Sequence, residues 1–550
     1  MTPILAVIVC LLLYLAGYHF YAKYLGRQVF QLNRITPTPA HQLRDNVDYV
    51  PSSKYVLFGH HYASITGLSP MLGPAIAVIW GWVPALLWVV FGTLLIGAVH
   101  DFGALVVSMR ARGMSIGKVA EGIIGSRAKT LFHIITFFLV GCSMGVFVHV
   151  CALLLTTAYN AEAAYPSATL MVLAVMVGWL VYKRGFGIGK VTVVAFGVTL
   201  VSVLVATRLP VISLGLVEWK LILLAYAFVA SVLPVWLLLQ PRDYINSLLL
   251  YLGLAGIYVG FFVLSPEFAA PPLRTQAAGA PPFFPFVFIV IACGAVSGFH
   301  GLVSSGTTAK QINKETDATF IGYGGMIGES LLGLASVLAC TAGFATRDLW
   351  MKHYQSWELA QGLGPNMKAF IEGSALFLSQ LGIPLNVAQA FIALVAISFA
   401  LTTLDSATRL LRFNISEIGD TMKLSLFSNR YLSSLVAVIV IGSLGFYEVN
   451  GQAAGLALWQ LFGTTNQILG GLTLFTITLY LMQRGRPYWY TACPMIFMLV
   501  TTLIAMFIKM GDFWKQGANL LLLLGGGIMI LSLWLAVEAG WCFFRRGSRR

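Results

Sequence analysis

Long apolar runs separated by short polar connections dominate the chain. A helix needs roughly 20 residues to cross a bilayer, and somewhat shorter runs suffice where tilted neighbours help. Fifteen runs fit this description: about 3–22, 55–80, 84–108, 131–158, 167–182, 191–207, 221–240, 246–265, 284–306, 319–343, 384–408, 431–447, 455–482, 489–508 and 518–541. The pattern predicts an all-α polytopic membrane protein with about 15 transmembrane helices.

Composition supports a location in lipid. Of the 550 residues, 58% are hydrophobic and only 10% are charged, whereas a soluble domain has about 25% charged residues. The first run lacks a basic leader and a small-residue cleavage site, so we interpret it as a retained span. The seven cysteines show neither paired spacing nor a CxxC motif, and we interpret them as core residues rather than disulfide or zinc partners: Cys10, Cys142, Cys151, Cys293, Cys340, Cys493 and Cys542.

The basic residues predict the orientation. With the N-terminus outside, all but eight of the 34 Lys and Arg residues fall in connections on the inner side, as the positive-inside rule requires. The eight on the outer side are Arg208, Lys220, Arg274, Arg347, Lys352, Lys368, Lys509 and Lys515. The net charge of +14 therefore reflects membrane orientation and indicates no nucleic-acid partner.

The run 55–80 is interrupted. Its helix-breaking residues are Gly59, Gly67, Pro70, Gly73 and Pro74. Broken backbone at membrane depth is tolerated only where it is buried in protein or lines a cavity, and it offers free N–H and C=O groups to a substrate or an ion. The alternative is a kinked helix with two histidines, His60 and His61, at the membrane interface.

A second interrupted run mirrors the first. The run 284–306 carries Gly294, Gly298, Gly301 and Gly306 around His300. Each interrupted run is followed by a span with one acid near its middle, Asp101 in the first case and Glu329 in the second. The two runs point in opposite directions, which favours inverted repeats with a binding site at their junction.

Several long motifs resemble those of the carbon starvation protein A family. They run in family order over roughly residues 45–470: DYVPSSKYVLFGHHYASITGLSPMLGP, GAVHDF, VLPVWLLLQPRDYIN, CGAVSGFHGLVSSGTT, FALTTLDSATRLLRFNISE and LWQLFGTTNQILGG. The resemblance implies a bacterial inner-membrane protein that takes up pyruvate or short peptides during carbon starvation, driven by protons. It also implies a leucine-transporter-like fold of five-plus-five inverted repeats with extra helices. One departure is His100, where we expect an amide in some relatives.

The resemblance implies a division of the chain into five parts. Residues 1–53 form an N-terminal helix and a cytoplasmic loop, and residues 54–210 form the first repeat. Residues 211–283 form an intervening helix pair and an outer loop. The second repeat, 284–482, includes a long outer loop at 344–383, and residues 483–550 form a C-terminal helix pair with a basic tail.

The predicted substrate site lies at the two interruptions. A carboxylate there would face freed N–H groups, where helix dipoles favour negative charge. Histidines with an unperturbed pKa of about 6.5 can bind a carboxylate when protonated, and they can pass protons; the alternative for His60 and His61 is a pair that snorkels to the interface. The candidate residues are Gly59, His60, His61, Ser64, Gly67, Ser69, Gly73, Gly298, His300, Ser304 and Ser305.

Asp101 and Glu329 are the candidate coupling acids. Burying a lone carboxylate costs several kcal/mol, so each must be protonated, paired or wet, and acids inside membrane spans are functional by default. The alternative is a structural pair with His100 or His300. A zinc site made from these acids with His60 and His61 is chemically possible, but no fixed spacing supports it, so we predict no metal.

A third group of candidates lies in the run 384–408. The resemblance suggests that Thr402, Thr403 and Ser406 form a cation site or its vestige. The alternative is that these hydroxyls bond to their own helix, beside an Asp405–Arg409 pair at i,i+4 spacing. Two further groups read as structural: Pro241, Arg242 and Asp243 as an inner-loop turn and gate pair, and the polar side chains of 460–467 as contacts between helices.

These patterns favour a secondary transporter over an enzyme. No Walker loop, GxSxG or HExxH motif is present. We expect import of short peptides and/or pyruvate with protons, with no cofactor, a small-molecule substrate and the lipid bilayer as partners, and an oligomeric state that the sequence leaves open. The alternatives are a sodium-coupled small-carboxylate symporter, a channel, and a nutrient sensor that does not transport, although no loop is large enough for a signalling domain.

Overall fold

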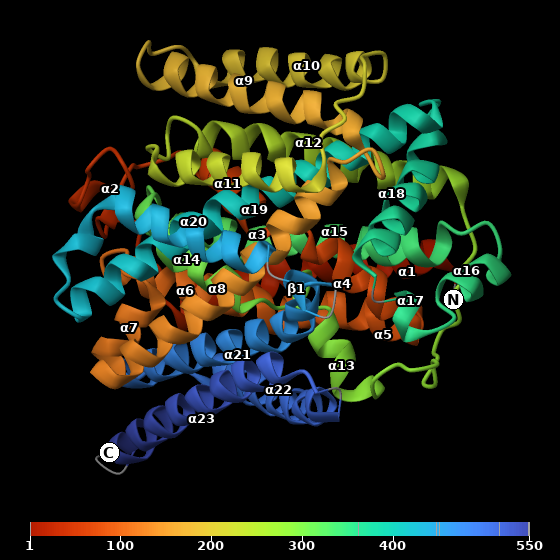
Figure 1. Cartoon of the computed structure of the whole chain (residues 1–550). Helices are drawn as coiled ribbons and strands as arrows, with labels where there is room; N and C mark the ends of the chain where they lie inside the picture. The colour runs from red at the N-terminus through yellow and green to blue at the C-terminus, as the bar shows by residue number, and fades with distance from the viewer. Residues whose placement is uncertain (1, 361, 447, 450–451, 516, 548–550) are drawn as a thin grey trace.

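The computed structural model describes residues 2–360, 362–446, 448–449, 452–515 and 517–547, and it is almost entirely helical (Figure 1). Every predicted run contains helix. The elements are α1 (Pro3–Ala16, continued by π-helical turns to Val29), α3 (Lys54–Ile65) with α4 (Ser69–Ala77), α5 (Trp82–Leu87) and α6 (Ala98–Arg110) joined by the π-helical stretch Trp88–Gly97, α8 (Ser126–Leu154), α9 (Ala164–Tyr182), α10 (Ile188–Ala206), α11 (Leu216–Val232), α12 (Leu239–Leu264), α13 (Phe283–Val290) with α14 (Gly298–Gly306), α15 (Gly324–Ala342), α19 (Leu385–Thr421), α20 (Arg430–Phe446), α21 (Ala454–Gln483), α22 (Trp489–Lys515) and α23 (Asn519–Gly547).

The all-α polytopic prediction is confirmed. By length and composition, ten helices in the described chain are able to cross a membrane, or up to eleven if the bent pair Lys54–Ile65 and Ser69–Trp80 forms one span. Helices α11 and α20, with 17 residues each, are shorter than a typical span. Both lie against long neighbours, since α11 packs on α8 and α19, and α20 packs on the same two helices.

The long helices run between two ends of the molecule. Figure 1 places α2 (Pro39–Gln42) and α7 (Ile116–Ile123) at one end, and α16 (Arg347–His353) and α17 (Trp357–Ala360) at the other. Helix α1 begins near the second end and α23 runs toward the first (Figure 1). The long connection 344–383 is itself largely helical and contains α16, α17 and α18 (Leu363–Ser379). Helix α18 packs on α4, α12 and α15.

The packing is reciprocal between two halves of the chain. Helix α6 lies on α14, and α15 lies on α4; the long helices α8 and α19 pack against each other. Helix α20 of the second half packs on α8 of the first half, and α11 of the first half packs on α19 of the second half. Two inverted copies of one unit produce such crosswise contacts.

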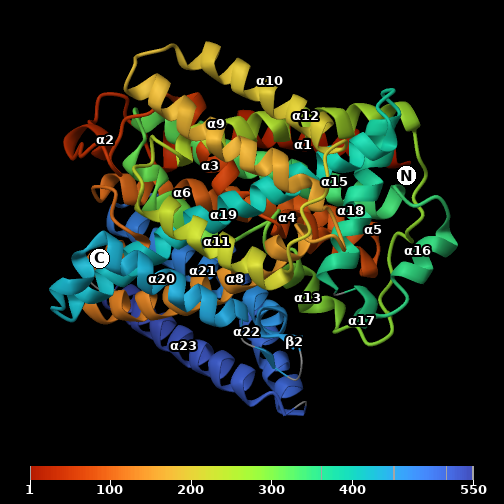
Figure 2. The same ribbon diagram turned by 45° about the horizontal axis from the view of Figure 1, so that its top comes forward.

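The helix pair that stands outside this arrangement is α9 and α10. These two pack on each other along one edge of the molecule (Figures 1 and 2), and many side chains of α10 are exposed. Helices α11 and α12, the predicted intervening pair, lie deeper, with α12 along α3 as α21 lies along α14. The contacts thus favour α9–α10 as the inserted pair, while the predicted domain boundaries stay a prediction.

A short antiparallel hairpin, β1 (Glu448–Val449) with β2 (Gln452–Ala453), joins α20 to α21.

Candidate functional site

The first predicted interruption is a true break in the helix. Helix α3 ends at Ile65 and α4 begins at Ser69, and the two axes differ by 48°. Pro70 in the first turn of α4 has no N–H to donate, so it suits a helix start. Gly67 lies in the break because a Cβ there would come within 2.7 Å of Thr403 Oγ1 and 3.0 Å of the Phe147 ring. The break therefore packs tightly between α8 and α19.

The second interruption is also a break. Helix α13 ends at Val290 and α14 begins at Gly298, with residues 291–297 between them. Gly294 has a φ of +89°, which disfavours residues with a Cβ. A Cβ on Gly298 would come within 2.3 Å of the Asn466 carbonyl oxygen on α21. The second break thus depends on glycine at a close backbone approach, and the first depends on glycine beside the side chains of Thr403 and Phe147.

The two breaks touch each other. A Cβ on Gly73 of α4 would lie 2.7 Å from the carbonyl oxygen of Val290, and one on Gly294 would lie 3.4 Å from Pro70. A cavity of about 10 Å³, roughly the space of one water molecule, lies beside the breaks. Its lining includes Gly67, Ser69 and Thr403 from the predicted set, with Ile65, Ser143, Met144, Phe147, Cys293, Phe299 and Phe462. This conformation is closed around the predicted site.

The predicted coupling acids belong to one buried cluster. Asp101 Oδ1 lies 2.7 Å from His100 Nδ1, and Asp101 Oδ2 lies 3.0 Å from His300 Nδ1. On the other side of the ring, His300 Nε2 lies 3.5 Å from Glu329 Oε1. All four side chains are fully buried. The structural pairing that we considered as an alternative is therefore present, and it joins both acids through His300.

When His300 donates its Nδ1–H to Asp101, this arrangement requires a further proton between His300 and Glu329. The Nε2 of the ring then carries a lone pair that faces Glu329. Two acceptors in contact repel each other, so either the ring or the carboxyl must carry a proton. Besides His300, the backbone of Gly294 in the second break also interacts with the Glu329 carboxyl group. The proton shared by His300 and Glu329 therefore lies directly against the second break.

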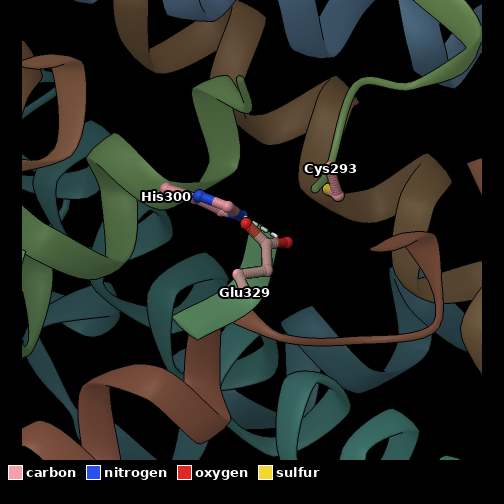
Figure 3. Close-up of side chains that lie close together, drawn as sticks. All are labelled: Cys293, His300 and Glu329. Carbon is pink, nitrogen blue, oxygen red and sulfur yellow. Dashed lines mark ion pairs between the residues drawn. The ribbon is translucent and has the colours of Figure 1, made fainter. Parts of the chain in front are cut away.

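Cys293, in the unwound segment, lies near this pair. Its Sγ and the donor atoms of His300 and Glu329 lie within 4.8 Å of one another, the one such three-residue group in the described chain. In Figure 3 the His300 ring and the Glu329 carboxylate point at each other, while Cys293 stands apart from them. Zinc prefers four ligands at about 2.0–2.3 Å. The contact between His300 and Glu329 fits a shared proton, and the prediction of no metal stays a prediction.

A second buried cluster lies where α3, α11, α12 and α19 meet. His60 Nδ1 lies 2.7 Å from Asp243 Oδ2, and the Arg242 guanidinium donates to Asp243 Oδ1 at 2.6 and 3.0 Å. Arg242 also forms an ion pair with Asp405, and Tyr226 donates to the same Asp405 oxygen at 2.5 Å. His60 and His61 are fully buried, so the alternative of an interfacial pair is wrong.

Two structural interpretations of charged residues are also wrong. Arg242 and Asp243 lie inside α12 and are fully buried; they do not form an inner-loop turn. Asp405 does not pair with Arg409: the Arg409 guanidinium binds Asp48 at 2.9 Å and the carbonyl oxygens of Ala230 and Leu233. The i,i+4 spacing of Asp405 and Arg409 did not indicate their ion-pair partners, because each side chain binds a residue outside α19.

The predicted hydroxyls divide among several roles. Thr402 Oγ1 donates to the Ser398 carbonyl oxygen at 2.9 Å and accepts from Asn246 at 2.9 Å, so it bonds to its own helix and to α12. Ser406 Oγ lies 3.0 Å from Ser64 Oγ and thereby joins α19 to α3. Thr403 Oγ1 has no hydrogen-bond partner among the described residues and faces the small cavity.

The remaining candidates do not form one pocket. His61 Nδ1 lies 2.9 Å from Thr308 Oγ1, and a Cβ on Gly59 would lie 2.7 Å from Ser247 Oγ on α12. Ser304 is fully buried in α14. Ser305 Oγ accepts from the Ile116 N–H at 3.2 Å, at the edge of a second cavity of about 180 Å³. The predicted substrate residues thus lie in four places: the breaks, the Arg242 cluster, the Asp101–His300–Glu329 cluster, and the end of α14.

Sequence reasoning missed the polar residues that α8 and α19 contribute to the second cavity. It lies between α7, α8, the end of α14 and α19, and its polar lining includes His133, Asn414 and Glu417. His133 Nδ1 lies 3.1 Å from Asn414 Nδ2, and Ser115 donates to Glu417 at 2.7 Å. The sequence signals near this cavity are Ser305 and Gly306, at the end of the second interrupted run. Asn466, in the polar stretch 460–467, donates to Ser297 at 3.0 Å, as expected for a contact between helices; the side chain of Gln460 lies outside the described residues.

Comparison with known proteins identifies the family. The model for "Carbon starvation protein CstA" matches residues 2–352 and 350–505. The chain belongs to the carbon starvation protein CstA family. It is 32% identical to the peptide transporter CstA of Escherichia coli K12, covering 91% of this chain and 80% of that protein. It is 30% identical to the pyruvate/proton symporter BtsT of the same organism, covering 90% and 80% of the two chains.

Solved structures with a similar chain path include a manganese transporter of Eremococcus coleocola and MhsT in complex with L-phenylalanine. The first shares 12% identity, covers 91% of this chain and 99% of that one, and has a TM-score of 0.48. The second shares 12% identity, covers 89% and 99%, and has the same TM-score of 0.48. The curated relatives are transporters, so the prediction that this chain is a membrane transporter and not an enzyme is confirmed.

Proposed function

We propose that this protein imports a small carboxylate-bearing nutrient, pyruvate or a short peptide, together with protons. The observation that carries the proposal is the contact between the two helix breaks, with the Asp101–His300–Glu329 cluster directly beside the second break. The relatives named as a peptide transporter and a pyruvate/proton symporter support both substrate classes and proton coupling.

The starts of α4 and α14 form the carboxylate site in this proposal. Both helices have nine residues and begin at the breaks, so their first N–H groups and helix dipoles favour an anion. One of these groups, the Phe299 N–H, donates to Asn466 Oδ1 at 2.8 Å in the closed conformation. A substrate carboxylate would take the place of this amide oxygen when the cavity opens.

The proton is held by His300 and Glu329 in this proposal. His300 is the third residue of α14 and lies close to the second break. Movement of this break on substrate binding therefore changes the distances from the His300 ring to Asp101 and Glu329. A change in that distance alters which of the two groups holds the proton. Substrate binding and proton binding are thereby linked through one side chain.

The position of Arg242 favours protons over sodium as the coupling ion. The resemblance placed a cation site between the first broken helix and the hydroxyls of α19. Here the guanidinium of Arg242 lies between Asp243 and Asp405 in that region, and all three side chains are fully buried. A cation fixed to the chain leaves less need for a bound sodium ion to balance the two carboxylates.

The orientation in this proposal has the N-terminus outside the bacterial inner membrane and the C-terminus inside. The cavity lined by Ser305, His133 and Glu417 then opens on the cytoplasmic side, as an exit path next to α14. The basic connections near α2 and α7 lie at that end of the molecule (Figure 1). Labelling of single cysteines placed in the 26–53 and 344–383 connections from either side of intact cells tests this orientation.

Counterflow in proteoliposomes tests the function. Vesicles preloaded with unlabelled pyruvate or a dipeptide should accumulate the labelled compound if the protein transports it. Binding without exchange would instead indicate a sensor. Accumulation driven by an imposed proton gradient in sodium-free buffer supports proton coupling, whereas loss of uptake on sodium removal alone would contradict it.

A further inference from the structure

A basic cavity lies at the end of the molecule that holds α2 and α7, away from the helix breaks. It has a volume of about 420 Å³ and lies between the ends of α6 and α21 and the chain segment 29–42. Its charged lining consists of Arg110, Arg112, Arg484, Arg486 and the single carboxylate of Glu315. We call it the arginine pocket. Four guanidinium groups against one carboxylate leave it with a net positive charge.

Among the described residues, a carboxylate pairs with one of the four arginines, Arg110. Arg110 Nε binds Glu315 Oε1 at 2.6 Å, and Arg110 Nη2 donates to the carbonyl oxygens of Phe30 and Gln31 at 2.8 and 3.2 Å. Arg112, Arg484 and Arg486 form no ion pair with any described residue, and Arg484 lies over the Tyr480 ring at 4.7 Å. The one carboxylate of the cavity, Glu315, is paired with Arg110, so the other three cations repel one another and suit an anion that accepts several hydrogen bonds.

Tyr480 provides a further polar group without a partner. Its side chain lines the pocket, it is 9% exposed, and its hydroxyl has no hydrogen-bond partner in the part of the chain that the structure describes. An unpaired buried hydroxyl costs free energy that a bound acceptor would recover. A phosphate group accepts from guanidinium and hydroxyl groups alike, which makes it the anion that fits this lining.

Aromatic residues place the pocket at the level of lipid headgroups. Tyr490 donates to the Tyr24 hydroxyl at 3.1 Å, and Trp489 beside it is 62% exposed. Tyr24 precedes the pocket residue Val29 by one helical turn, and Trp489 follows Arg486 closely along the chain. Exposed Tyr and Trp residues gather where the hydrocarbon of a bilayer meets water.

We propose that the arginine pocket binds the phosphate group of an anionic phospholipid. Basic pockets between spans on the cytoplasmic side are known to take such headgroups, and a volume of about 420 Å³ is within the range of small-molecule sites. The bound phosphate would join α6, α21 and the segment 29–42 through Arg112, Arg484 and Arg486. The site is separate from the proposed substrate and proton sites, and the proposal does not depend on them.

Thermal unfolding of the purified full chain tests the proposal, with lipid added to detergent micelles. Phosphatidylglycerol should raise the unfolding midpoint by several degrees, and phosphatidylcholine, which has no net charge, should raise it much less. Inorganic phosphate is the third addition. A rise with inorganic phosphate equal to that with phosphatidylglycerol would show that the pocket takes free phosphate, which supports an anion site but contradicts a lipid as its occupant.

Variants locate the effect. In R484Q/R486Q the stabilisation by phosphatidylglycerol should be lost, and R484K/R486K, which keeps the charge, should recover part of it. The matched control is K183Q/R184Q at the end of α9, where Lys183 lies over Trp236 and does not line the pocket. R112Q changes a single residue and so disturbs the pocket less than R484Q/R486Q. Native mass spectrometry should show fewer co-purified anionic lipids on R112Q than on wild type. Equal stabilisation of wild type, R484Q/R486Q and R112Q by phosphatidylglycerol would overturn the proposal.

Discussion

His300 Nδ1 on α14 lies 3.0 Å from Asp101 Oδ2 on α6, so the second broken helix is tied to the span that follows the first one. The opposite nitrogen of the same ring faces Glu329 on α15. A single imidazole thus connects the two acids that we predicted as coupling groups. Any movement of α14 relative to α6 or α15 must change at least one of these contacts.

Glu329→Gln should uncouple transport from the proton gradient. The amide keeps the shape of the side chain but cannot release a proton, so uptake driven by a proton gradient should fall by at least about tenfold, corresponding to roughly 1.4 kcal/mol. Exchange of labelled for unlabelled substrate should persist. Glu372→Gln is the control, because Glu372 is exposed and pairs with Lys368 at 3.8 Å. Gradient-driven uptake by Glu329→Gln at the wild-type rate would contradict the assignment.

Arg242→Ala should destabilise the protein and create a sensitivity to sodium. Removing the guanidinium leaves Asp243 and Asp405 buried without their shared partner, which costs about 3–5 kcal/mol for a buried pair. A small cation can then occupy the space. Sodium should raise the unfolding midpoint of the variant and leave that of the wild type unchanged. A wild-type midpoint that itself rises with sodium would argue for the sodium-coupled alternative.

Gly298→Ala should prevent the start of α14 from packing against α21. The added Cβ would come within 2.3 Å of a backbone oxygen, which no side-chain rotation can relieve, so a loss of about 1–3 kcal/mol is expected. Gly526→Ala is the control, since no atom lies within 4 Å of a Cβ placed there on α23. Thermal unfolding should separate the two, and equal midpoints would show that the contact between Gly298 and Asn466 is looser than the structure indicates.

Asp48→Asn should weaken the contact between the 43–53 connection and α19. Burial disfavours the ionised carboxylate, but the charges of Arg409, Lys310 and Arg412 outweigh this effect and hold the pKa of Asp48 below its ordinary value. A lowered folded-state pKa contributes stability above the unfolded pKa and loses it only as the pH falls through the folded pKa. The difference in midpoint between wild type and variant should therefore be the same at pH 6 and pH 8. A difference that shrinks at pH 6 would contradict an ionised Asp48.

The sequence predicted the helices and both breaks because these depend on local chemistry. Apolar length sets a span, and the glycine and proline residues around Gly67 and Gly294 disfavour a continuous helix there, although Gly59 and Pro74 lie inside α3 and α4. The two acids could also be found, since a carboxylate inside an apolar run stands out. These features need no knowledge of which helices touch.

Partners across the fold could not be predicted in the same way. Asp405 lies four residues before Arg409, yet it binds Arg242, which precedes it by more than a hundred and fifty residues. Asp243 and His60 are likewise joined only by packing of α12 on α3. The position of α9–α10 at the edge depends on which apolar faces meet, and these hydrophobic runs resemble those of the buried helices.

Substrate-driven proton movement tests the central claim most directly. Proteoliposomes in sodium-free buffer, with a pH-sensitive dye inside, should acidify internally when pyruvate or a dipeptide is added outside, and those with Glu329→Gln should behave like vesicles without protein. Acidification by wild type and variant at equal rates, or uptake of labelled substrate with no change in internal pH, would contradict proton coupling through His300 and Glu329.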